Sequence, residues 1–173
     1  MTAIETRIAA GLERAFAEKG FAEPNVEALR DAAGVSLRTL YKYAPSRDAM
    51  IRTALEHRHR RYIAHMFDDL PEATDLALSA IVERIADWMK QEAAHGCLFH
   101  AAVAAAPYDR DLRALLQRHK SEVARRAAEA TGLAERETDL MLIIEGLTQS
   151  WPLLGDAAVE SARRLGLGLR SAA

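Results

Sequence analysis

The sequence has little of what secreted, disulfide-bonded or membrane-spanning proteins need. Its 173 residues contain a single cysteine, Cys97, which excludes an intramolecular disulfide framework and favours a reducing compartment. No apolar run approaches the roughly 20 residues that span a bilayer. The N-terminal residues have neither the basic start nor the apolar segment of a signal peptide. These absences predict a cytoplasmic protein with no membrane partner.

The common signatures of catalysis and metal binding are also missing. The sequence has no glycine-rich phosphate loop, no nucleophile elbow and no pair of carboxylates with an identifiable partner. None of the six histidines has a second histidine four residues on or a cysteine at zinc-finger spacing. We therefore predict no enzyme activity, no metal site and no cofactor.

The chain as a whole has no excess of positively charged residues. Lysine and arginine total 23 against 25 aspartate and glutamate residues, and the formal net charge is -2. Many nucleic-acid-binding proteins are strongly basic overall. Any contact with DNA must therefore come from a local patch.

What the sequence has in abundance is helical periodicity. Apolar residues recur at intervals of three and four rather than in alternation, which predicts helices and no strands. Thr2 with Glu5 has the spacing of a capping box, and Gly20 is placed to end the first helix. We predict an all-α fold with about nine helices. Their expected bounds are 3–19, 26–33, 37–43, 46–67, 74–95, 97–106, 109–131, 135–154 and 157–170.

Two short helices meet at a glycine turn in the first third of the chain. Asn25 is placed to cap the helix at 26–33, which Gly34 ends, and Ser36 is placed to cap the helix at 37–43. A helix-turn-helix needs a bracing helix, a sharp turn and a second helix whose first residues reach base edges in the major groove of DNA. These parts occur here in that order.

The second of these helices carries cations and hydroxyl groups. Between Gly34 and Arg47 there is no aspartate or glutamate. A face of this kind attracts phosphate locally, despite the acidic total. We therefore predict double-stranded DNA as a partner. The candidate DNA-binding residues on this stretch are Ser36, Arg38, Thr39, Tyr41, Lys42, Tyr43 and Arg47.

Residues 33–50, AGVSLRTLYKYAPSRDAM, resemble the signature of the tetracycline-repressor (TetR) family, and residues 7–8 and 16–21 resemble that family's first helix. The resemblance covers roughly the first 55 residues. It implies base contacts at the start of the recognition helix, from Leu37 and above all from Arg38. It implies phosphate contacts for Asn25, Thr39, Tyr41, Tyr43 and Arg47.

Two positions depart from the family pattern. Ala44 stands where phenylalanine or another large apolar residue is usual, which predicts a looser junction beneath the recognition helix. Leu37 stands where a polar residue, often lysine, is common, which removes one contact to DNA. We therefore expect an unusual operator or a modest affinity.

Large apolar side chains with a few polar ones recur in the rest of the chain. Binding sites between helices are often apolar cavities with a few polar anchors. We predict such a pocket for a small-molecule effector, although each residue taken alone is better explained as core. The candidates are Trp88, Met89, Phe99, His100, Met141, Gln149 and Trp151.

Two further features have competing interpretations. Cys97, near His95 and His100, is either a reactive sensor thiol or a buried inert one. Residues 57–61, HRHRR, are a solvated helix face, a second phosphate contact or a pH-sensitive element.

The last two predicted helices have apolar faces that are either core or a dimer surface. TetR-like proteins pair their last two long helices in a four-helix bundle, so the resemblance implies a homodimer. Symmetry then places two recognition helices about 34–36 Å apart on a palindromic site. The candidate interface residues are Leu140, Ile143, Ile144, Leu147, Val159 and Leu165.

These features predict a helix-turn-helix DNA-binding domain at 1–45 and a helical regulatory and dimerisation domain at 46–173. We expect a transcriptional repressor that binds a palindromic operator as a homodimer and is released by a small apolar or amphipathic molecule. Two alternatives stay open. One is a helical enzyme or small-molecule carrier, and the other is a DNA-binding activator or architectural protein without a ligand.

Overall fold

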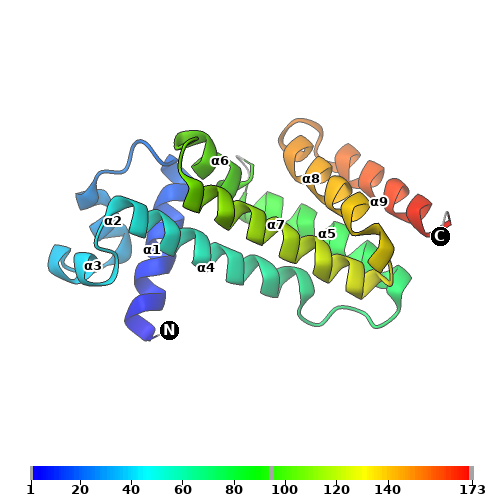
Figure 1. The fold of residues 1–173 in the computed structure, drawn as a ribbon, viewed down its shortest axis with the longest axis horizontal. Helices are drawn as coiled ribbons and strands as arrows, with labels where there is room; N and C mark the ends of the chain where they lie inside the picture. The colour runs from blue at the N-terminus through cyan, green and yellow to red at the C-terminus, as the bar shows by residue number, and fades with distance from the viewer. Residues whose placement is uncertain (1, 94–95, 172–173) are drawn as a thin grey trace. The chain divides into compact units, whose positions relative to one another are not determined.

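The computed structural model describes residues 2–93 and 96–171. Within these ranges the chain forms nine α-helices, one short 3-10 helix and no strand (Figure 1). The predicted all-α fold of about nine helices is confirmed. The elements are α1 (Ala3–Lys19), α2 (Val26–Ala33), α3 (Leu37–Tyr43), α4 (Arg47–Phe67), α5 (Thr74–Glu92), α6 (Leu98–Ala105), α7 (Arg110–Thr131), η1 (Ala134–Arg136), α8 (Glu137–Leu154) and α9 (Asp156–Ser171).

The helices belong to two compact units. Unit 1 consists of Met1–Arg61 and Leu98–Ala114, and unit 2 consists of Tyr62–Cys97 and Leu115–Ala173. Helices α4 and α7 contribute residues to both units. The predicted helix-turn-helix domain at 1–45 and regulatory domain at 46–173 have a different boundary from these units, and this division into functional domains stays a prediction.

The first three helices of unit 1 form a close-packed module. Helix α1 packs against α2, and α2 packs against α3. At Gly11 the backbones of α1 and α2 approach so closely that a Cβ atom would lie 2.3 Å from the carbonyl oxygen of Ala32. A guanidinium nitrogen of Arg14 donates to the same oxygen at 3.0 Å. The side chains of Leu12, Phe16, Leu29 and Leu40 are completely buried.

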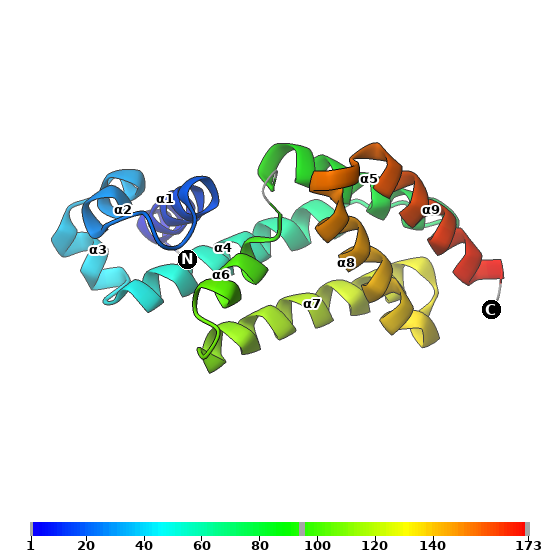
Figure 2. The ribbon, with the colours of Figure 1, turned by 90° about the horizontal axis from the view of Figure 1, so that it is seen from above.

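Unit 2 is built around α5, α8 and α9. Helix α9 packs against both of the others (Figure 2). The buried core of this unit includes residues from the end of α4 and from α5, α7, α8 and α9. Arg84 on α5 donates to the carbonyl oxygens of His65, Met66 and Asp68, which closes the C-terminal end of α4. In the described ranges, each helix is too short or too polar to cross a bilayer.

Candidate nucleic-acid interface

The turn between α2 and α3 has the geometry that its sequence predicts. Gly34 adopts a left-handed conformation (φ 63°, ψ 38°), and its N–H donates to carbonyl oxygens at the end of α2. The Asn25 side chain accepts from the backbone N–H of Ala28 at 2.9 Å. Ser36 Oγ accepts from the N–H of Thr39 at 3.1 Å. The predicted caps and glycine turn are confirmed, so the start of α3 is held at a fixed place.

Helix α3 buries one side and exposes the other. Leu40 is completely buried, which fastens the helix to the module. Most of the cationic and hydroxyl-bearing side chains point outward. Asn25, Ser36, Arg38, Tyr41 and Lys42 are exposed, and Leu37, Thr39 and Tyr43 are half-buried. The Lys42 ammonium lies 5.4 Å from the centre of the Tyr43 ring.

Ala44, the C-cap residue that follows α3, is completely buried. Its N–H donates to the carbonyl oxygen of Leu40 at 2.8 Å, which completes the last turn of the helix. The small side chain therefore lies inside the module. Whether the junction beneath α3 is looser than is usual for a helix-turn-helix stays a prediction.

Arg47 makes contacts that the sequence did not indicate. Its two terminal guanidinium nitrogens donate to the carbonyl oxygens of Pro24 at 2.7 Å and Phe21 at 2.6 Å. The same guanidinium lies 5.8 Å from the centre of the Phe16 ring. Arg47 thus fastens the start of α4 to the segment between α1 and α2. The predicted contact of Arg47 with a DNA phosphate is untested. The guanidinium would have to make that contact in addition to its two hydrogen bonds with carbonyl oxygens.

Replacing Arg47 with alanine is expected to lower the free energy of unfolding by about 2 kcal/mol, because two charge-assisted hydrogen bonds are lost. Arg52→Ala is the matched control on the same helix. Its exposed ion pair with Asp111 spans 3.8 Å and should contribute about 0.5 kcal/mol or less. Urea unfolding measures both. Equal effects from the two variants would show that the Arg47 contacts do not stabilise the module.

The residues predicted to line an effector pocket are divided between the two units. Trp88 and Met89 on α5 are buried in the core of unit 2, and Trp151 on α8 packs against the same core. On α8, Met141 is half-buried and Gln149 is exposed. Phe99 and His100 belong to α6 in unit 1, where Phe99 is buried and His100 is exposed. The structure therefore brings together only part of the predicted set.

A group of aromatic rings surrounds Trp88, and sequence spacing did not reveal it. The ring of Tyr62 lies 5.2 Å from Trp88 and 5.3 Å from His119, and the ring of His65 lies 5.4 Å from Trp88. These residues come from α4, α5 and α7, so only the packing of three helices unites them. The buried Nε1 of Trp151, at the edge of this core, has no hydrogen-bond acceptor within the described residues.

The candidate interface residues also separate into two groups. Leu140, Ile144 and Val159 are buried in the core of unit 2, so they do not form an open surface. The other three line a groove of about 440 Å³ between α8 and α9, called the α8–α9 groove below, although Leu147 is itself only 2% exposed and also belongs to the core. Its walls are Leu142, Ile143, Gly146, Leu147, Ser150, Leu154, Ala158, Ser161, Ala162 and Leu165.

Cys97 is half-buried, and its neighbour His95 lies outside the described residues. Its reactivity stays a prediction. The residues that the structure describes contain no group of three or more histidine, cysteine, aspartate or glutamate side chains arranged to hold a metal ion.

Comparison with known proteins points to one family. The family model described as bacterial regulatory proteins, tetR family, matches residues 8–54, which contain both helices of the helix-turn-helix. No curated protein matches the chain.

Several solved structures share the fold over nearly the whole chain. A TetR-family transcriptional regulator from Streptomyces coelicolor has a TM-score of 0.75 at 22% identity, covering 96% of this chain and 95% of its own. A TetR transcription regulator from Haloarcula marismortui has a TM-score of 0.79 at 16% identity, covering 99% and 98%. A transcriptional regulator from Rhodococcus sp. has a TM-score of 0.79 at 17% identity, covering 99% and 97%. At these identities the likeness establishes the fold.

Proposed function

We propose that this chain is a member of the tetR family of bacterial regulatory proteins and that it represses transcription as a homodimer on a palindromic operator. The match of its N-terminal module to the family model and its fold support the membership. A small apolar or amphipathic molecule releases the dimer from DNA. The observation that carries the proposal is the exposed, acid-free face of α3 behind the left-handed turn at Gly34. This is the geometry that presents a recognition helix to the major groove.

The electrostatics of α3 suit DNA in spite of the acidic total charge. The exposed cations Arg38 and Lys42 lie on a stretch without carboxylates. Arg38, one residue into the helix, is the side chain proposed to contact a guanine edge. The cap at Asn25 uses its side-chain oxygen, so the amide nitrogen is the group that would donate to a phosphate. Tyr41 and Tyr43 would add hydroxyl donors to phosphates.

A second copy of the chain is the proposed occupant of the α8–α9 groove. Leu142 on α8 and Leu165 on α9 are 67% and 60% exposed, respectively, and both line the groove. Contiguous apolar surface of this kind marks interaction sites. One short recognition helix gives little specificity by itself, whereas two related by a twofold axis cover a palindrome.

The proposed effector site lies at the aromatic core of unit 2. The buried indole N–H of Trp151 lacks an acceptor within the described residues, and an unpaired buried donor is costly. An apolar effector that carries one acceptor oxygen would satisfy it. Tyr62 and His65 of α4 belong to the same aromatic group, and α4 begins at the DNA-binding module. Helix α4 is therefore the element proposed to transmit effector binding to the recognition helices.

Selection of bound duplexes from a random DNA pool tests the proposal directly. The expected product is a palindrome whose half-sites are centred about one helical turn apart. An enriched pool without symmetry, or no enrichment, would contradict it. A small molecule that raises the melting temperature and also releases the selected DNA supports the repressor. A thermal shift without any DNA binding would instead favour the enzyme or carrier.

Replacing Arg38 with alanine is expected to relax the preference at one base pair in each half-site, at a cost of about 1–3 kcal/mol in discrimination. Lys42→Ala is the control from the same helix, because a phosphate contact weakens binding to all sequences alike and lowers the salt dependence. Affinities for a panel of single-base operator variants measure both effects. If both substitutions weaken every variant equally, Arg38 does not contact a base.

A further inference from the structure

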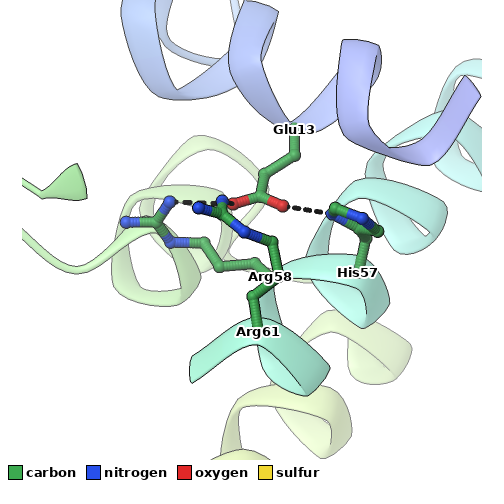
Figure 3. A network of polar contacts seen from close by, with 4 residues as sticks. All are labelled: Glu13, His57, Arg58 and Arg61. Carbon is green, nitrogen blue, oxygen red and sulfur yellow. Dashed lines mark hydrogen bonds and ion pairs between the residues drawn. The ribbon is translucent and has the colours of Figure 1, made fainter. Parts of the chain in front are cut away.

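A buried carboxylate on α1 is surrounded by three side chains from α4. Glu13 Oε1 accepts from Arg58 Nη1 at 3.0 Å and from Arg61 Nη1 at 2.7 Å. Glu13 Oε2 lies 2.5 Å from His57 Nδ1. These two atoms are within hydrogen-bond distance of each other. Figure 3 shows the carboxylate between the imidazole on one side and the two guanidinium groups on the other.

Burial makes this Glu13 cluster, consisting of Glu13, His57, Arg58 and Arg61, sensitive to geometry. The side chains of Glu13 and Arg58 are 3% and 5% exposed. The interpretation of these α4 residues as a wholly solvated face is therefore wrong. A buried charge that loses its partner is strongly destabilising, so other positions of α4 along α1 are disfavoured. The cluster accordingly selects one arrangement of the two helices.

Two contacts fix the direction of α4 relative to the recognition helix. The first is Arg47, which holds the start of α4 to the segment after α1. The second is the Glu13 cluster, about 15 to 21 Å further along α4 at 1.5 Å per residue. Helix α1 packs tightly on α2 at Gly11, and α2 packs on α3. Both contacts therefore hold α4 in a fixed orientation relative to the module that contains α3.

We propose that the Glu13 cluster is a positioning device that sets which operator half-site spacing the dimer accepts. The proposal rests on the proposed function as a dimeric DNA-binding protein. Each recognition helix is connected through α4 to the unit that contains the α8–α9 groove. The direction in which α4 leaves the module therefore determines the separation of the two recognition helices. Glu13 does not contact DNA in this account; it acts through α4.

The test uses the full-length protein and the palindrome that the wild type selects from a random pool. Binding is measured to that palindrome, to versions whose spacing is changed by about 2 base pairs in either direction, and to a duplex with one half-site. Glu13→Gln is expected to weaken binding to the native palindrome about ten-fold. Binding to the single half-site should change about two-fold or less. The preference among spacings should therefore flatten.

Glu18→Gln is the matched control, because it removes the same charge from an exposed position on α1. It should keep the spacing preference of the wild type. If circular dichroism shows that Glu13→Gln does not fold, Arg61→Gln decides the question. The Arg61 side chain is 39% exposed, and Glu13 keeps His57 and Arg58 as partners in that variant.

Two results would overturn the positioning role. The first is a cluster variant that folds and keeps the spacing preference of the wild type. The second is an equal loss of affinity for the single half-site and for all the palindromes, because a general loss of stability would explain that result. If the wild type itself shows no spacing preference, the proposed dimeric function fails first, and the role of the cluster fails with it. The wild-type measurement thus separates the two failures.

Discussion

Replacing Gly11 with alanine is expected to unfold the N-terminal module. The added Cβ atom would lie 2.3 Å from the carbonyl oxygen of Ala32 and 2.5 Å from the Cα atom of Ala33. Both are backbone atoms of α2, so no side-chain rotation can relieve the overlap. Forcing the two helices apart exposes the core between them and should cost about 3 kcal/mol. Urea unfolding followed by circular dichroism measures the loss, and DNA binding should disappear with it.

Gly168→Ala is the control for this experiment. Gly168 lies in α9 with an ordinary helical backbone, and an added Cβ atom would meet no described atom within 4 Å. Alanine there should stabilise the helix by about 0.5–1 kcal/mol. A Gly11→Ala variant as stable as the wild type would mean that α1 and α2 do not cross as closely as the structure shows.

If the proposed homodimer forms through the α8–α9 groove, replacing Leu165 with glutamate is expected to dissociate it. The side chain is 60% exposed in the single chain, so the fold of the monomer should survive the change. In the dimer the new carboxylate would be buried in the α8–α9 groove without a partner, which is strongly unfavourable. Affinity for the palindrome should fall about 100-fold, because the two recognition helices no longer bind as one unit. Light scattering and DNA titration measure the two effects.

Leu76→Glu controls for the introduced charge itself. Leu76 on α5 is 56% exposed and lies outside the groove. This variant should remain dimeric and keep its affinity for the palindrome. A dimeric Leu165→Glu protein would place the interface elsewhere on the chain.

Local features of the fold were predictable from the sequence because neighbouring residues determine them. The cap at Ser36 and the left-handed turn at Gly34 depend on residues within one helical turn. The recognition helix and the exposed position of Arg38 follow from the same short segment. Matching that segment to a family needed no tertiary information.

Long-range contacts were not predictable, because helix crossings decide them. Glu13 meets His57, which is 44 residues away, and Arg47 reaches back 26 residues to Phe21. In the sequence each is only one of many charged residues on a helix. Apolar periodicity also did not separate the inner residues of α8 from the outer ones. Leu140 is core and Leu142 is exposed, although apolar spacing predicted Leu140, and not Leu142, as an interface residue.

Hydroxyl-radical footprinting of the selected duplex tests the central claim most directly. The account predicts two protected stretches on one face of the DNA, centred about 10 base pairs apart, with two chains bound per duplex. Their spacing would report the separation of the two α3 helices in the dimer. A single protected stretch, or protection by one chain alone, would contradict the account.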